Sequence, residues 1–250
     1  MVQIKSAAQV AKMRSAGGVV GETLAVLREA VEPGITPRDL NAIGEKEIRA
    51  RGAVPSFLGY YGFPATLCIS VNDEVVHGIP GDRPLESGDI VSIDCGAILD
   101  GWHGDAAITV GVGEIAPDVA ALVRVCEESL EAGIAAMRPG RRVRDIGTAV
   151  EKSVRAAGPY GIVEDYGGHG IGTEMHQDPH VLNYRTRARG PKLVAGLVLA
   201  IEPMITMGSA ETRLLDDEWT VKTADGSWAA HFEHTVAVTP DGPWVLTTPE

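Results

Sequence analysis

The stretch LESGDIVSID at residues 85–94 returns in altered form as LVAGLVLAIE at residues 193–202. The two copies share a leucine, a glycine and an isoleucine, and each ends on an acid after an apolar run, Asp94 in the first and Glu202 in the second. Further upstream, the window of residues 33–52 recurs 106 positions later with nine identities. Self-similarity of this kind indicates a repeated structural unit.

A second acid follows each copy along the chain. Asp105 lies in HGDAAITV and Glu233 lies in HFEHTVAV. Two units related by a pseudo-twofold axis would bring all four acids together at that axis. Buried carboxylates that lie close together need protons or cations, because an uncompensated charge in the interior is very costly. The sequence therefore predicts a carboxylate-rich metal site in a single catalytic domain, between two halves at about residues 1–115 and 116–250.

Composition fits an ordinary globular enzyme and disfavours several other classes. With 250 residues and 44% hydrophobic content, the chain can bury a large core. A net charge of −12 disfavours nonspecific binding to nucleic acid or anionic membranes. Cys68, Cys95 and Cys126 show no CxxC spacing, so we expect no disulfide framework and a reducing, cytoplasmic compartment. No apolar run approaches the ~20 residues of a membrane span, and nothing resembles a signal peptide.

Helix and strand signals run through the whole chain. Thr36 as N-cap, Pro37 at the first helical position and Gly52 at the end are typical of one helix. Helices are expected at residues 10–31, 37–52, 118–137 and, from the repeat, 143–158. Strands are expected at residues 65–71, 89–99, 102–110, 197–206 and 231–239. These patterns predict an α+β fold with a mainly antiparallel central sheet and helices on the outside.

The most specific local feature is a hairpin at Asp100-Gly101. This dipeptide is the strongest signal for a two-residue turn with positive φ at both positions. With these residues as the loop, Asp94 faces Ala107, and Asp105 lies diagonally across from Asp94 on the same face, roughly 7 to 8 Å away at the backbone. Both carboxylates would then reach the same cations. The alternative is a pair of surface acids on an exposed strand.

His169 lies in GGHGIG at residues 167–172, where the glycines permit tight turns and close backbone approach. A glycine-rich loop can also bind phosphate, but this one lacks the Lys and Ser/Thr of a P-loop. The sequence His77-Gly78-Ile79 matches the segment that begins at His169, and His176 follows one loop later. We expect His169 to bind the metal, with His77 and His176 lining the same cleft. The alternative is a histidine that is satisfied within the core.

Several motifs together resemble those of the type I methionine aminopeptidases, which have a pseudo-symmetric pita-bread fold. The motifs are CISVNDEVVHGIP at 68–80, IDCGAILDGWHGD at 93–105, GGHGIG at 167–172, IEPM at 201–204 and EHT at 233–235. The resemblance implies a metallopeptidase that removes the N-terminal Met of nascent polypeptides and prefers a small second residue. It places the family's metal ligands on Asp94, Asp105, His169, Glu202 and Glu233.

The implied cofactor is a pair of divalent cations. Four carboxylates and one imidazole form a mostly hard ligand set, which suits Mn²⁺, Fe²⁺, Co²⁺ or Zn²⁺. A bound metal lowers the pKa of water toward ~7, so hydroxide is available at neutral pH. By the resemblance, Asp105 and Glu233 bridge the ions and Glu202 carries a proton to the leaving amine. His176 would donate a hydrogen bond to the oxyanion, and His77 would hold the amide on the leaving side.

The resemblance also implies a substrate pocket for the methionine side chain. Its walls would be Tyr60, Phe63, Cys68 and Trp219. Sulfur-to-ring contacts contribute about 0.3 to 1.5 kcal/mol each, which favours a thioether over a bare aliphatic chain. Met175 departs from the family pattern, because many relatives carry an aromatic residue there. The alternative for the aromatic residues is a purely structural place in the core.

Two other functions stay open from the sequence. Prolidases and aminopeptidase P share the fold but carry an additional N-terminal domain, for which 250 residues leave no room. A binding protein that had lost catalysis would lack at least one ligand, and none is missing. The expected partners are the N-terminal Met of nascent polypeptides and, transiently, the ribosome, with no direct nucleic-acid specificity and no membrane.

Overall fold

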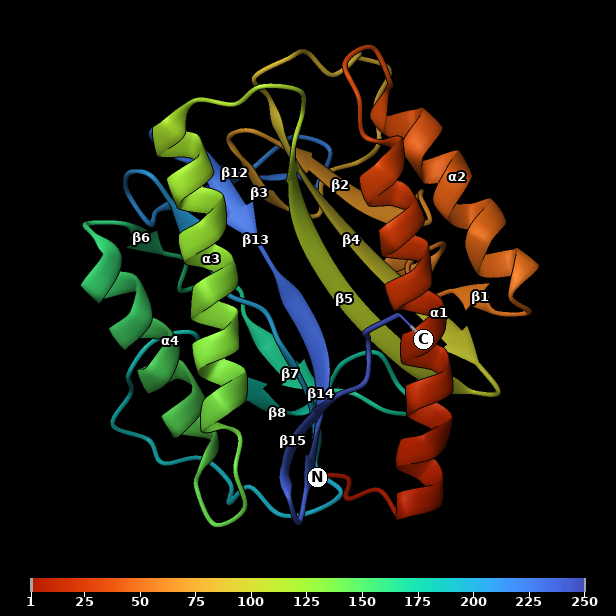
Figure 1. Ribbon diagram of the computed structural model, residues 1–250, viewed down its shortest axis with the longest axis vertical. Coiled ribbons are helices and arrows are strands. Elements are labelled where there is room, and N and C mark those ends of the chain that lie inside the picture. Colours follow the sequence, from red (N-terminus) through yellow and green to blue (C-terminus); the bar gives the residue numbers. More distant parts are fainter. Residues whose placement is uncertain (1, 250) are drawn as a thin grey trace.

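Four long helices flank a central sheet in the computed structural model, which describes residues 2–249 (Figure 1). In Figure 1 one helix pair lies to the right of the sheet and the other to the left. The first pair is α1 (Ala7–Ala30) and α2 (Pro37–Ala50), and the second is α3 (Pro117–Ala136) and α4 (Val143–Ala157). A short 3-10 helix, η1, spans Tyr60–Gly62. All four predicted helices are confirmed, each within a few residues of its expected bounds.

Local capping explains where the first two helices begin. The Ser6 hydroxyl accepts a hydrogen bond from the Gln9 amide at 3.3 Å, and the Gln9 side chain accepts one from the Ser6 amide. Thr36 caps α2 in the same way, accepting from the Asp39 amide at 3.1 Å. Gly52 follows the end of α2 with φ of 75°, in the left-handed region that glycine adopts without strain. These caps satisfy backbone groups that a helix end otherwise leaves free.

The main sheet is antiparallel throughout and has nine strands among the described residues. Its order is β1 (Val54–Pro55), β4 (Ile90–Leu99), β5 (Trp102–Gly111), β14 (Glu233–Thr239), β9 (Val198–Ile201), β7 (Gly168–Gly170) and β8 (Gln177–Val181). In addition, β2 (Leu67–Val71) pairs with β4, and β15 (Gly242–Val245) pairs with β14. The predicted α+β fold with a mainly antiparallel central sheet is therefore confirmed.

Two small sheets complete the architecture. One joins β13 (Ala229–His231), β10 (Met204–Thr206) and β6 (Gly161–Ile162). The other joins β11 (Thr212–Leu214), β12 (Val221–Thr223) and β3 (Glu74–Val76). Within residues 2–249, no helix has both the length and the apolar character that crossing a membrane requires.

The hairpin of β4 and β5 has the predicted register. Asp94 faces Ala107, and the turn residues Asp100 and Gly101 have φ of 50° and 78°. Gly104 lies against α1, where a Cβ would come within 2.8 Å of the Gly17 backbone. Since side chains alternate along a strand, Asp105 points to the opposite face, away from α1. The hairpin therefore packs one face on a helix and presents its acids on the other.

Two expected strands are wrong in extent. The run 197–206 is two strands, β9 and β10, interrupted at Glu202 and Pro203. Proline has no N–H to donate to a strand ladder, so the ladder stops there. The run 231–239 is divided at Phe232, between β13 and β14. Both interruptions fall beside predicted metal ligands.

Candidate metal centre

Four carboxylates and one imidazole converge on the sheet from separate strands. Asp94 lies on β4, Asp105 on β5, Glu233 on β14 and His169 on β7, and Glu202 directly follows β9. Register explains the convergence, because the residue opposite Asp94 on β5, Ala107, also pairs with Glu233 on the next strand. All five side chains are buried, with exposures between 2% for Glu233 and 9% for Asp94 and Glu202.

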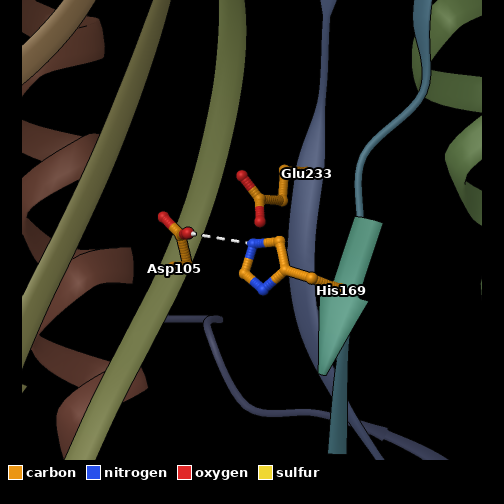
Figure 2. A group of neighbouring side chains, drawn as sticks. All are labelled: Asp105, His169 and Glu233. Atoms are coloured by element: carbon orange, nitrogen blue, oxygen red, sulfur yellow. Dashed lines mark ion pairs between the residues drawn. The ribbon is translucent and has the colours of Figure 1, made fainter. Parts of the chain in front are cut away.

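The side chains point toward a common centre. Figure 2 shows Asp105, His169 and Glu233 directed at one another from three strands, and one ligand atom from each lies within 4.8 Å of the others. The Nε2 atom of His169 is 3.8 Å from Asp105 Oδ2 and 3.5 Å from Glu202 Oε1. These spacings bring together four of the five residues that the sequence predicted as metal ligands, and the fifth, Asp94, lines the same cavity as these four.

Burial keeps the acids from ionising readily without a cation. Desolvation raises the pKa of Asp94 to about 7 and that of Glu202 to about 8, where neighbouring Asp94 adds to the effect. Burial and the other acids raise the pKa values of Asp105 and Glu233 well above their usual range. Burial lowers the pKa of His169 to about 3, so its imidazole is neutral at physiological pH.

Several buried oxygens of the cluster have no hydrogen-bond partner among the described residues. They are Asp94 Oδ1, Asp105 Oδ1 and Glu233 Oε1. Buried polar atoms are normally satisfied, and an unpaired carboxylate oxygen in the interior is costly. Divalent cations would supply the missing partners, and oxygen and imidazole donors suit such ions. The residues present therefore fit a metal centre.

One further residue of this cluster, His231, was not predicted from the sequence. Its side chain is 1% exposed, its Nε2 lies 3.8 Å from Glu202 Oε2, and one ligand atom each from Glu202, His231 and Glu233 lie within 4.8 Å of one another. Burial lowers the pKa of His231 to about 3. The sequence His231-Phe232-Glu233 could have indicated this ligand, because residues two apart on an extended chain point to the same face.

A cavity of about 250 Å³ opens onto the acids. Every predicted site residue lines this cavity, and so do Phe57, Tyr61 and Val76. The predicted residues are Tyr60, Phe63, Cys68, His77, Asp94, Asp105, His169, His176, Glu202, Trp219 and Glu233. Phe63 and Trp219 meet edge to face with ring centres 5.1 Å apart. Met175 is buried in the apolar cluster that also contains Phe57, and it is not among the lining residues.

Histidines connect this cavity to a larger cleft of about 990 Å³. His77, His169, His176 and Glu202 line both spaces. The Tyr60 hydroxyl lies 2.8 Å from His176 Nδ1, which fixes the imidazole at the junction. Burial lowers the pKa of His77 to about 4. The acids thus lie between a smaller, partly aromatic cavity and a larger cleft.

Known proteins resemble this chain over almost its full length. The model of metallopeptidase family M24 matches residues 11–240. Methionine aminopeptidase 1 of Mycobacterium tuberculosis is 55% identical, covering 99% of this chain and 95% of that protein. A crystal structure of methionine aminopeptidase from Rickettsia prowazekii superposes with a TM-score of 0.96 at 41% identity, covering 99% of this chain and 100% of that one. A prolidase from Pyrococcus horikoshii shares the fold, with a TM-score of 0.77 at 21% identity, but only 64% of that chain is covered against 99% of this one.

Proposed function

The chain belongs to metallopeptidase family M24, and from its 55% identity to a methionine aminopeptidase over 99% of its length we propose that it is a methionine aminopeptidase. As an M24 metallopeptidase, it is a hydrolase that uses divalent metal. Its reaction is hydrolysis of the first peptide bond, which releases the N-terminal Met of nascent polypeptides, preferably before a small second residue. The observation that carries the proposal is the convergence of four buried acids and His169 beside a cavity of about 250 Å³ that includes aromatic and sulfur-bearing side chains.

We propose that Asp94, Asp105, His169, Glu202 and Glu233 hold two divalent ions, of Co, Mn, Fe or Zn. Four carboxylates carry −4, which two such ions balance. Bound there, such ions would supply Lewis acidity at the scissile carbonyl and would lower the pKa of a water toward neutral pH. Support comes from the buried oxygens of Asp94, Asp105 and Glu233 that have no hydrogen-bond partner in the described part of the chain.

Proton transfer is assigned to Glu202. Of the four acids of the cluster, only Glu202 lines both the cavity and the cleft, and a carboxylate so placed can accept a proton from water and donate it onward. The group lies at the junction of cavity and cleft, within reach of a peptide bond that spans the two. Glu202 would take a proton from the attacking water and pass it to the leaving amine.

The histidines of the junction orient the substrate. In the tautomer with its hydrogen on Nε2, His176 would accept the Tyr60 hydroxyl hydrogen at Nδ1 and donate the Nε2 hydrogen to the developing oxyanion. His77, neutral because burial lowers its pKa, would hold the amide on the leaving side. Asp94 would lie against the free α-amino group, which restricts cleavage to the terminal residue.

The cavity fits a thioether side chain. Tyr60, Phe63, Cys68 and Trp219 line it, and sulfur-to-ring contacts contribute about 0.3 to 1.5 kcal/mol each.

Around this site, we propose one catalytic domain of two halves, residues 1–115 and 116–250, in which the sequence repeat supplies α2 and α4. A cytoplasmic location and a transient ribosome contact complete the proposal, because nascent chains are the substrate.

A cleavage panel tests this function. The metal-loaded protein should remove Met from Met-Ala-Ser and from Met-Gly-Met-Met and should leave X-Pro peptides intact. Preferential cleavage of X-Pro peptides would instead indicate a prolidase-like enzyme. No hydrolysis, together with no stoichiometric metal, would indicate a binding protein that has lost catalysis.

A further inference from the structure

His231 is a buried imidazole that the reaction described above leaves without a role. It ends β13 and is 1% exposed, and its Nε2 has no hydrogen-bond partner among residues 2–249. Its backbone is fixed, because its amide donates to Thr109 Oγ1 at 2.9 Å and β13 pairs with β10 at Met204. A rigidly held, buried nitrogen without a partner calls for a ligand.

Glu202 lies between two imidazoles. Its Oε1 is 3.5 Å from His169 Nε2, and its Oε2 is 3.8 Å from His231 Nε2. Both distances are longer than an ordinary N–H···O hydrogen bond of about 2.7 to 3.2 Å. Two atoms that share one divalent ion lie about 2.0 to 2.2 Å from it, so they are at most roughly 4.4 Å apart. Both imidazoles therefore lie too far from Glu202 for a hydrogen bond but close enough for each to bind the same ion as a Glu202 oxygen.

The same pattern extends to Glu233. Ligand atoms of Asp105, His169 and Glu233 lie within 4.8 Å of one another, and so do those of Glu202, His231 and Glu233. Each group contains one imidazole, and Glu233 belongs to both. Resting on the proposed function for the presence of metal, we propose that His231 is a sixth protein ligand, donating Nε2 to an ion held by Glu202 and Glu233.

A second imidazole changes which ions the centre prefers. Neutral imidazole adds no charge, so the balance between four carboxylates and two cations is kept. Nitrogen donors strengthen binding of Fe²⁺, Co²⁺ and Zn²⁺ relative to Mn²⁺, which is better suited by oxygen donors. His231 is thus expected to shift the centre toward the nitrogen-preferring ions.

The test compares the wild-type chain with a His231→Gln variant, both loaded with two equivalents of Co²⁺ after chelation. X-ray absorption of the cobalt should show two imidazoles per chain in the wild type and one in the variant. Removal of a residue that only hydrogen-bonds to a metal ligand typically lowers metal affinity by about 10- to 100-fold. Loss of a direct ligand should therefore lower the affinity for Co²⁺ by at least that factor. Affinity for Mn²⁺ should fall less.

His234→Gln is the matched control. His234 follows Glu233 directly, but it borders a separate pocket beside α1, and its Nδ1 lies 2.8 Å from the Thr247 hydroxyl. This variant should keep two imidazoles at the cobalt. The same count in wild type and His231→Gln would overturn the proposal, even with lower activity, because His231 would then only position Glu202.

The wild-type protein alone also decides the matter, should His231→Gln fail to fold. A single imidazole per chain in the wild-type spectrum would overturn the assignment of His231. If that same sample cleaves Met-Ala-Ser, the proposed function survives and only this inference fails. If the wild type binds no cobalt at all, both fail together.

Discussion

In the metal-free protein, Asp94 and Glu202 should each contribute stability that falls as pH rises. The pKa of Asp94 is about 7 and that of Glu202 about 8 in the fold, both raised chiefly by burial. In the unfolded chain these groups titrate near 4, so the fold retains protons that the unfolded chain releases. The stability that these protons provide is present at low pH and is lost as pH rises through about 7 and 8.

The size of the effect follows from the shifts. Between about pH 5.5 and pH 8.5, Asp94 should lose roughly 2 kcal/mol and Glu202 roughly 3 kcal/mol, at 1.36 kcal/mol per pKa unit. The buried histidines oppose this loss below about pH 6.5, because burial lowers the pKa values of His77, His169 and His231 to about 4, 3 and 3, so that the unfolded chain binds the extra protons. The contribution of the two acids, on the order of 5 kcal/mol, is therefore measured as a difference from a variant that lacks their titration.

Thermal melting of the chelated protein across this pH range measures the loss directly. Asp94→Asn is the control, because it keeps the histidines and removes one titrating acid, so the wild type should lose roughly 2 kcal/mol more than this variant between about pH 5.5 and pH 8.5. A fixed concentration of Mn²⁺ that is 100 times the Kd near pH 7 should stabilise the protein by about 2.7 kcal/mol there, and by more at higher pH, where ionised ligands lower the Kd. A chelated wild type whose stability changes with pH by the same amount as that of Asp94→Asn would refute this reasoning.

Three further substitutions probe chemistry and packing. Glu202→Gln should lower kcat for Met-Ala-Ser by about 10²- to 10⁴-fold because proton transfer is lost, and normal turnover with normal metal content would exclude this role. His176→Ala should lower kcat by about 10²- to 10³-fold with little change in KM, whereas a change confined to KM would argue against oxyanion stabilisation. Gly104→Ala should cost about 1 to 3 kcal/mol in a denaturant melt, since its Cβ would come within 2.8 Å of Gly17, and an unchanged midpoint would contradict that packing.

The hairpin could be predicted from sequence because its determinants are local. The Asp100-Gly101 turn sets the register, and alternation along the strands then places Asp94 and Asp105 on one face. The helix ends were equally readable, because Thr36 and Gly52 act on backbone groups a few residues away. Local chemistry of this kind depends little on the rest of the fold.

Three features of the structure were not predicted, and two of them depend on distant contacts. Pro203 is a strand-breaking residue, but the apolar residues on both sides of it predicted one continuous strand where the structure has β9 and β10. His231 was not predicted as a site residue because Glu202, which lies beside it in the fold, is 29 positions earlier in the chain. Only the pairing of β13 with β10 brings the two residues together. The position of Met175 outside the cavity lining likewise follows from packing against distant residues.

The number of divalent ions bound per chain tests the metal centre most directly. Elemental analysis of the reconstituted wild type should find two ions, and Asp105→Asn should bind fewer and lose Met-Ala-Ser hydrolysis in parallel. Full hydrolysis by a chain stripped of metal, or unchanged metal content after Asp105→Asn, would contradict the account.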